Sequence, residues 1–290
     1  MNGILLIDKE EDWTSHDVVA KLRGILKQRR IGHAGTLDPL ATGLLTIFVG
    51  GATKAVQFAE AAEKTYITHL KLGITTDTQD ITGTVLTKTK ANVSREALEA
   101  ILPQYIGDIM QVPPMYSALK VDGERLYKLA RKGVEVTRAP RPVTIGSIDI
   151  LEELEDGFSL AVTCSKGTYI RTLCHDIGQT LGVGATMAAL RRTAVGNFLV
   201  DNAHSLEKVQ MTEEKSQLFL PLDSLFVNYP RVVINQKQEE RLRWGQVFPV
   251  AEKHLDVCAV YNEQGEFLSL GKIMLEDGNV LKAVKNFFTE

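Results

Sequence analysis

The chain has 290 residues, of which 44% are hydrophobic and 24% are charged. These fractions are ordinary for globular proteins, so they exclude wholesale disorder and allow roughly two domains of ~150 residues. The 33 basic and 36 acidic side chains give a formal net charge of −3, which excludes a uniformly basic protein that coats nucleic acid.

The first half of the chain alternates between strand-like and helix-like patterns. Residues 3–8 form an apolar run that predicts a strand, and Thr14 and Ser15 offer N-caps for a helix that continues to Gln28. The glycine-rich residues 32–43 indicate a loop. The other predicted elements are a strand at 44–49, a helix at 52–62, strands at 64–73 and 83–87, and a helix from Ser94 to about Ile101, before Pro103.

The second half continues this irregular alternation. We predict a helix at 124–132, strands at 143–151 and 158–164, and a helix at 168–181. Several neighbouring strands are joined by short turns, which favours an α+β fold over regular βαβ units. The segment Asn228-Tyr229-Pro230 predicts a domain boundary, with one domain at 1–229 and a small β-rich module at 230–290.

Basic residues are segregated along the chain. Residues 18–37 contain five basic side chains and no acidic one, and residues 120–141 contain seven basic against three acidic. This pattern indicates one positive face on a slightly acidic molecule, as binding of a polyanion requires. The alternative is that these Lys and Arg side chains have no ligand and only expose helix faces to solvent.

Neither cysteines nor an apolar segment point to an oxidising or membrane environment. The three cysteines, Cys164, Cys174 and Cys258, form no CxxC pair, so neither a disulfide framework nor a thiolate zinc site is indicated. The N-terminus MNGILLIDKEEDW has acids where a signal peptide carries basic residues. The apolar stretch at 39–53 is shorter than the ~20 residues of a membrane helix. We therefore expect a soluble, cytoplasmic protein.

The segment GHAGTLDPLATG at residues 32–43 has the features of a catalytic loop. Its three glycines permit tight turns and close approach of a ligand to the backbone. Pro39 holds the preceding Asp38 in an extended conformation, which presents its carboxylate from a stiff loop near His33. The Asp-Pro pair is also typical of a helix N-cap, and taken alone these residue types favour that structural role.

This segment resembles the catalytic loop of the tRNA pseudouridine synthase B (TruB) family, in which its aspartate is the catalytic residue. Asp8-Lys9 departs from the family pattern in being followed by Glu10 and Asp12, where Pro and Gly are common. The resemblance extends over about residues 1–200. Its further blocks, in the family's order, are Lys64-Thr65-Tyr66, VPPMYSALK at 112–120, CSKGTYIRTL at 164–173 and ALRR at 189–192.

The resemblance implies an isomerase that converts a uridine in the TΨC loop of tRNA (position 55) to pseudouridine. It implies a catalytic domain with a mixed, largely antiparallel sheet flanked by helices, followed by a PUA-like RNA-binding domain. The reaction breaks the N1–C1′ bond and joins C5 to C1′ without oxidation or reduction, so we expect no cofactor and no metal. We expect the T-arm stem-loop of tRNA as the partner, no protein partner, and a monomer.

The family pattern also implies the residues that bind the target base. Flipping a base out of RNA costs a few kcal/mol, and stacking on an aromatic ring returns roughly 1–3 kcal/mol. Tyr66 is the implied stacking partner, and Tyr169 and Leu190 are expected to line the pocket. His33 is expected to fill the gap that the flipped base leaves.

Charged residues around the loop are expected to hold the substrate and the catalytic group. Arg171 is expected to pair with Asp38 and to keep it ionised and oriented. Lys54 is expected near the site, and its surroundings lack the spacing of a P-loop, which argues against ATP binding. The clusters at 21–30 and 125–141 are expected to contact phosphates.

Two other functions fit parts of the same sequence. An RNA-binding protein that has lost catalysis would keep the fold, although the complete set of site residues argues against it. A glycoside hydrolase would use Asp38 with a second carboxylate, for which Asp77 or Asp80 are candidates. The aromatic content of 7% argues against the aromatic-rich cleft of such an enzyme.

Overall fold

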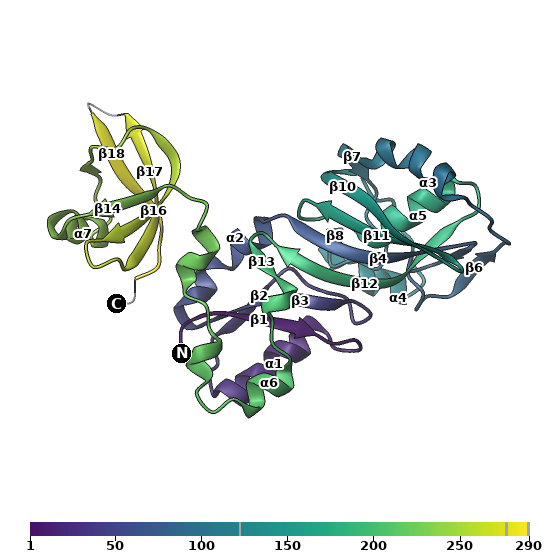
Figure 1. The fold of residues 1–290 in the computed structure, drawn as a ribbon, viewed down its shortest axis with the longest axis horizontal. Helices are drawn as coiled ribbons and strands as arrows, with labels where there is room; N and C mark the ends of the chain where they lie inside the picture. Colours follow the sequence, from purple (N-terminus) through teal and green to yellow (C-terminus); the bar gives the residue numbers. More distant parts are fainter. Residues whose placement is uncertain (122, 276–277, 289–290) are drawn as a thin grey trace.

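The computed structural model describes residues 1–121, 123–275 and 278–288, and these form two β-rich lobes (Figure 1). The larger lobe contains the N-terminus and a nine-stranded sheet, whereas the smaller lobe contains a five-stranded sheet built from the end of the chain. Strands and helices alternate without a regular repeat, which confirms the predicted α+β class.

The large sheet is mixed and largely antiparallel, as predicted. β12 pairs in parallel with β3, and the other pairings described in this sheet are antiparallel. In spatial order the strands are β1 (Gly3–Lys9), β3 (Thr42–Val49), β12 (Ala185–Val195), β4 (Lys64–Leu72), β11 (Gly157–Cys164), β10 (Arg141–Leu154) and β7 (Gly107–Gln111), with β2 (Ile31–Ala34) beside β3 and β13 (Phe198–Leu199) beside β12.

Helices cover the sheet at both of its ends. α5 packs on β4 and β12, while α1 packs near β2 and contacts α6. The helices of this lobe are α1 (Ser15–Leu26), α2 (Val56–Ala61), α3 (Arg95–Ile101), α4 (Leu126–Arg131), α5 (Ile170–Thr180) and α6 (Leu206–Met211). Short 3₁₀ helices lie at η1 (Gly50–Ala55), η2 (Leu102–Tyr105), η3 (Val200–Asn202), η4 (Lys215–Leu218) and η5 (Leu222–Phe226), and two ribbons pair β5 (Ile74–Thr76) with β6 (Val85–Lys88) and β8 (Lys120–Val121) with β9 (Glu124–Arg125).

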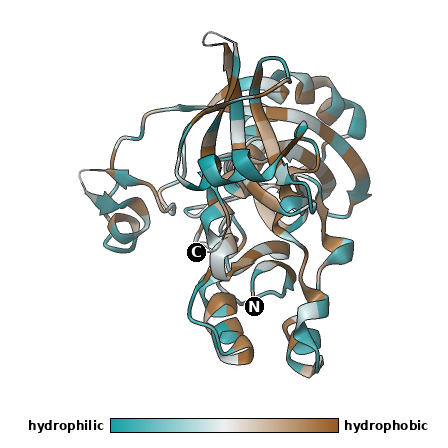
Figure 2. Cartoon of the chain, turned by 90° about the vertical axis from the view of Figure 1, so that its left-hand side faces the viewer, coloured by the Kyte–Doolittle hydropathy of each residue, from teal (hydrophilic) through white to brown (hydrophobic). Residues whose placement is uncertain are grey.

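As far as the structure describes it, the smaller lobe is a single five-stranded sheet with one helix. Its strands in spatial order are β14 (Arg231–Ile234), β16 (Leu255–Asn262), β17 (Phe267–Leu275), β18 (Asn279–Asn286) and β15 (Phe248–Pro249), and its helix is α7 (Gln236–Arg243). In Figure 2 hydrophobic stretches lie mainly along the strands, and the turns between them are mostly hydrophilic. Strands supply much of the buried core, whereas turns lie at the surface.

Apolar packing joins the two lobes. Phe226, just before the smaller lobe, lies with its ring centroid 5.4 Å from that of Phe267 and 5.7 Å from that of Phe287. Phe58 of α2 lies 5.5 Å from the same ring. Side chains of both lobes therefore belong to one hydrophobic cluster. Among the described residues, no helix has both the length and the apolar composition needed to cross a membrane.

Several local predictions are confirmed by the helix and strand ends. Thr14 caps α1 as predicted: its Oγ1 accepts from the Asp17 backbone N–H at 3.1 Å, and Asp17 Oδ2 accepts from the Thr14 N–H at 3.0 Å. Ser94 caps α3 in the same way, accepting from the Ala97 N–H. All three cysteines are buried and unpaired.

Other predictions were wrong at their boundaries or missed an element. The predicted loop at 32–43 begins as strand β2, because these residues pair with β3, so the loop itself covers residues 35–41. The helix predicted at 124–132 begins at Leu126, because the two residues before it pair with β8. The pattern predicted neither the central strand β12 nor helix α7.

Gly43 lets β3 and β12 come together. Its φ is +96°, and a Cβ at this position would lie 2.3 Å from the backbone oxygen of Arg192 on β12. We predict that Gly43→Ala lowers the free energy of unfolding by at least about 2 kcal/mol, as measured by urea denaturation. Gly24→Ala is the control, since it lies in α1 with open space around it and should stabilise by up to about 1 kcal/mol. Equal effects of both changes would contradict this account.

Candidate active site

The loop at residues 35–41 is fixed to the N-terminal part of the chain. Ser15 Oγ accepts from the Leu37 N–H at 2.9 Å and donates to the Leu37 carbonyl at 3.2 Å. The buried ammonium of Lys9 donates to the Pro39 carbonyl at 3.2 Å. These contacts attach the loop to β1 and to the start of α1, so the backbone that carries its side chains is held in place.

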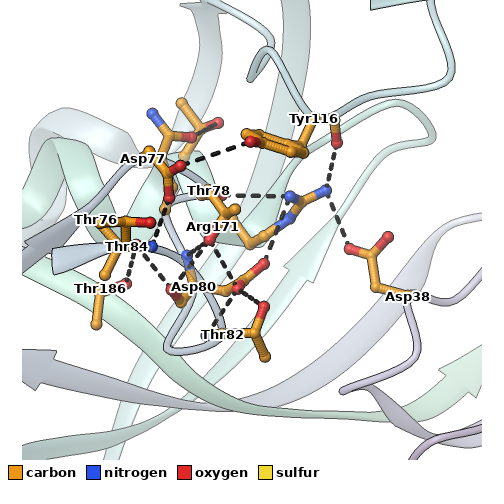
Figure 3. A network of polar contacts seen from close by, with 12 residues as sticks. Asp38, Thr76, Asp77, Thr78, Asp80, Thr82, Thr84, Tyr116, Arg171 and Thr186 are labelled. Atoms are coloured by element: carbon orange, nitrogen blue, oxygen red, sulfur yellow. Dashed lines mark hydrogen bonds and ion pairs between the residues drawn. The ribbon is translucent and has the colours of Figure 1, made fainter. Parts of the chain in front are cut away.

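Asp38 projects from this loop toward Arg171 (Figure 3). Its Oδ2 lies 3.0 Å from Nη2 of Arg171, so the ion pair expected between them is present. The Asp38 side chain is 43% exposed, whereas that of Arg171 is 7% exposed. The carboxylate is therefore held on one side by a buried cation and open on the other side to a ligand.

Arg171, on α5, is itself held by two other segments (Figure 3). Nη2 donates to the Tyr116 carbonyl at 3.0 Å, and Nη1 donates to the Thr78 carbonyl at 3.3 Å. Nη1 also lies 3.5 Å from Oδ2 of Asp80. Because the guanidinium fork is planar and its donors are directed at several segments, its position relative to the loop at residues 35–41 is tightly determined.

Asp80 is a buried partner of Arg171 and is itself surrounded by donors. Its Oδ1 accepts from Thr78 Oγ1 at 2.9 Å, from the Thr82 N–H at 3.0 Å and from Thr82 Oγ1 at 2.6 Å. Asp77, in contrast, is exposed and accepts from the Thr84 N–H at 2.7 Å. Asp80 thus supports the arginine and is not presented to a ligand. Sequence reasoning missed this role, although the threonines two residues before and after Asp80 are typical of such a hydrogen-bonded turn.

Two tyrosines lie near the Asp38 carboxylate. Tyr66 lies on β4 and Tyr169 directly precedes α5. Burial raises the pKa of both phenols, and the negative charge of Asp38 adds to the rise in each case. Gln111 fixes Tyr169 by accepting from its N–H at 2.8 Å and donating to its carbonyl at 3.1 Å. Both phenols therefore stay protonated near neutral pH, beside the carboxylate.

Apolar side chains complete this part of the site. Leu190 on β12 and Leu40 of the loop pack against the same hydrophobic cluster as Tyr66. In the sheet, Leu190 lies opposite Thr68 and Arg192 lies opposite Tyr66. Leu190 and Tyr66 are thus neighbours on adjacent strands.

His33 and Lys54 are placed differently from the other predicted residues. The His33 ring on β2 lies edge-on to His16, with centroids 5.5 Å apart. Burial lowers the pKa of His33, and the charges of His16 and Arg192 lower it further. Its Nδ1 is buried and has no hydrogen-bond partner among the residues described. Lys54 is exposed on η1, and in the described part of the chain no hydrogen bond or ion pair joins it to Asp38 or Arg171.

Basic side chains are exposed in both predicted clusters. In the second cluster the guanidinium carbons of Arg125 and Arg131 lie 6.0 Å and 5.6 Å from the ring centroid of Tyr127. An open cavity of about 340 Å³ is lined there by Lys120, Gly123, Glu124, Arg125, Tyr127 and Lys128. Interleaved cations and aromatic rings are typical of surfaces that bind nucleic acid. In the first cluster the exposed side chains are Lys21, Arg23, Lys27, Arg29 and Arg30.

Known proteins resemble this chain over nearly its whole length. Residues 23–170 match the N-terminal domain of TruB family pseudouridylate synthases, and residues 171–227 match the C-terminal domain of tRNA pseudouridylate synthase B. The chain is 43% identical to tRNA pseudouridine synthase B of Stutzerimonas stutzeri, with 97% of this chain and 94% of that protein covered. It is 45% identical to the protein of the same name from Clostridium kluyveri, with 93% and 95% covered.

The fold has solved relatives as well. A crystal structure of a Cbf5–Nop10–Gar1 complex contains a chain that is 26% identical, with a TM-score of 0.75. The match covers 99% of this chain and 85% of that chain. Both lobes therefore fall within the structural match.

Asp80 should matter more to stability than its neighbour Asp77. We predict that Asp80→Asn lowers the free energy of unfolding by about 1–3 kcal/mol. The change removes the negative charge beside the buried Arg171 guanidinium, and the amide has one fewer oxygen to accept the hydrogen bonds around this position. Asp77→Asn, at an exposed carboxylate, should have a smaller effect. Urea denaturation of both variants tests this, and a larger loss for Asp77→Asn would contradict it.

Proposed function

Because the chain belongs to the TruB family of pseudouridylate synthases, we infer that it is a tRNA-modifying isomerase, a tRNA pseudouridine(55) synthase. It converts a uridine in the TΨC loop of tRNA to pseudouridine. The geometry that best supports this function is the half-exposed Asp38 carboxylate, which a buried arginine holds beside two protonated phenols. No part of the reaction requires oxidation, reduction or a transferred group.

We propose that Asp38 is the catalytic residue. The isomerisation breaks the N1–C1′ bond, turns the base and forms a C5–C1′ bond; C5 loses one proton and N1 gains one. An ionised carboxylate is required to start this rearrangement. The ion pair with Arg171 orients the Asp38 carboxylate for this step.

We propose that the flipped uridine lies between Asp38 and the tyrosines. Tyr66 would stack on the base, and Tyr169 and Leu190 would form the walls of the pocket. A base extruded from the T loop loses its stacking partners, and the aromatic ring replaces part of that energy. The shared packing of Tyr66 and Leu190 against one cluster supports this arrangement.

The other predicted residues are proposed to bind the rest of the RNA. In the described part of the chain, the buried His33 Nδ1 has no hydrogen-bond partner, which supports a role in which His33 meets RNA in the space that the base vacates. The exposed clusters at 21–30 and 125–141 would contact phosphates, and Lys54 lies beside Thr53, whose hydroxyl accepts from Arg30 at 2.8 Å. Lys54 is therefore proposed to join the first cluster.

We propose a domain boundary after residue 229, with residues 230–290 forming a PUA-like RNA-binding domain. Its separate five-stranded sheet supports this division. Trp244 after α7 is 83% exposed and offers a surface for stacking of an unpaired base. We also propose that the protein acts as a monomer. Because its substrate is tRNA, we propose that the protein acts in the cytoplasm.

Asp38→Asn tests the proposed chemistry. We expect at least a roughly thousand-fold loss of turnover, because the amide cannot supply an ionised carboxylate, while tRNA affinity stays within about three-fold. The assay incubates the purified protein with an unmodified tRNA transcript, without metal or nucleotide, and maps pseudouridine. The wild type should modify a single uridine in the T loop. Comparable turnover by the variant would remove Asp38 from the mechanism.

Tyr66→Leu tests the proposed stacking position. Loss of roughly 1–3 kcal/mol of stacking predicts a decrease of about 5- to 150-fold in turnover in the same assay. Tyr105→Leu is the matched control, because this partly buried tyrosine bonds to Thr180 and lies outside the proposed pocket. Unchanged turnover in Tyr66→Leu, or equal losses in both variants, would exclude the stacking role.

A further inference from the structure

Arg192 is a buried cation for which the proposed mechanism has no role. It is 1% exposed and is the largest of the fully buried side chains. Its Nε donates to the Leu44 carbonyl at 2.7 Å and its Nη2 to the Gly35 carbonyl at 2.9 Å. Among the described residues, no carboxylate lies within ion-pair distance of it. Burying a charge without a counter-ion is costly, so a position that keeps one points to a use for the charge.

Arg192 lies where the two halves of the large sheet meet. On β12 it is opposite Gly43 of β3 on one side and opposite Tyr66 of β4 on the other. Its side chain extends to Gly35, where a Cβ would lie 3.1 Å from Nη1. The guanidinium thus ties β12, which pairs with the strand that carries Tyr66, to the loop that carries Asp38.

The charge of Arg192 reaches groups on several elements around the site. Burial lowers the pKa of Lys9 on β1 and of His33 on β2, and the charge of Arg192 lowers both further. It adds to the burial that lowers the pKa of Lys64 on β4 to about 8. It also opposes the rise that burial causes in the pKa of Tyr66. Lys9, His33, Lys64 and Tyr66 therefore all lie within the field of this guanidinium.

We propose that Arg192 is a positioning residue for the isomerisation: it fixes Tyr66 relative to the Asp38 loop and places an uncompensated positive charge behind the uracil ring. This inference rests on the proposed function. When the N1–C1′ bond breaks, its electron pair goes to the base, which becomes anionic. The negative charge is consumed when C5 bonds to C1′, after which C5 releases its proton and N1 takes one up. A fixed cation near the base stabilises the charge that develops in between.

The neighbouring Arg191 provides a matched control. It makes two hydrogen bonds to Asp8, Nη1 to Oδ1 at 3.0 Å and Nη2 to Oδ2 at 2.8 Å. Its side chain is 41% exposed, and it is opposite Ile67 in the sheet. Adjacent strand residues point to opposite faces, so Arg191 has an ordinary ion pair on the face away from Tyr66.

The experiment compares Arg192→Met, Arg192→Lys and Arg191→Met in the full-length protein. The readouts are single-turnover release of tritium from C5 of uridine in a tRNA transcript, and the Kd for that transcript. We expect Arg192→Met to slow release by at least about 100-fold with Kd within about three-fold. Arg192→Lys should recover at least about ten-fold of that loss, because it keeps the charge. Arg191→Met should stay within about three-fold of wild type in both.

Several outcomes would overturn the inference. A folded Arg192→Met with a wild-type rate would exclude any positioning role, and equal rates for the Met and Lys variants would exclude a role for the charge. If Arg192→Met does not fold, a double-mutant cycle of Arg192→Lys with Tyr66→Phe decides: coupling of at least about three-fold supports the inference, and additive effects overturn it. A wild-type protein that releases no tritium would instead contradict the proposed function.

Discussion

The ion pair between Arg171 and Asp38 is the interaction on which the site depends. A carboxylate on an exposed loop would sample many orientations, and the buried guanidinium restricts it to one. The guanidinium is in turn fixed by Asp80 and by the carbonyls of Thr78 and Tyr116. Three distant segments must therefore fold together before the carboxylate is in place. This dependence links the stability of the surrounding fold directly to the geometry of the site.

Buried cations are a second feature of the region around the loop. Lys9, Lys64 and Arg192 are nearly inaccessible to solvent, and backbone carbonyls accept their hydrogen bonds. Neutral acceptors satisfy the donors without cancelling the charge. The field of these cations therefore remains available to an anionic ligand or a developing negative charge, as binding and rearranging a nucleotide both require.

The two lobes are joined by ring packing, which has consequences for RNA binding. Phe226 contacts Phe58 in the larger lobe and Phe267 and Phe287 in the smaller one. Such apolar contact disfavours independent movement of the lobes. A surface on the smaller lobe would therefore be held at a set distance from Asp38, so both could engage one folded RNA without a large rearrangement.

Local sequence was sufficient for the capped helix α1, for most strands of the larger lobe and for the loop that presents Asp38, because caps, periodicity and Asp-Pro geometry act over a few residues. It missed β12 because Arg191 and Arg192 are not typical of a buried strand. Their hydrogen-bond partners, Asp8 and the carbonyls of Leu44 and Gly35, lie far away in the sequence. The contacts of Asp80 and Arg192 were decided only by the tertiary structure. Asp80 meets Arg171, and Arg192 meets Gly35, across long stretches of intervening chain. Neighbouring residues determine how a segment folds, but the partner of a buried charge is determined by which distant segments pack against it.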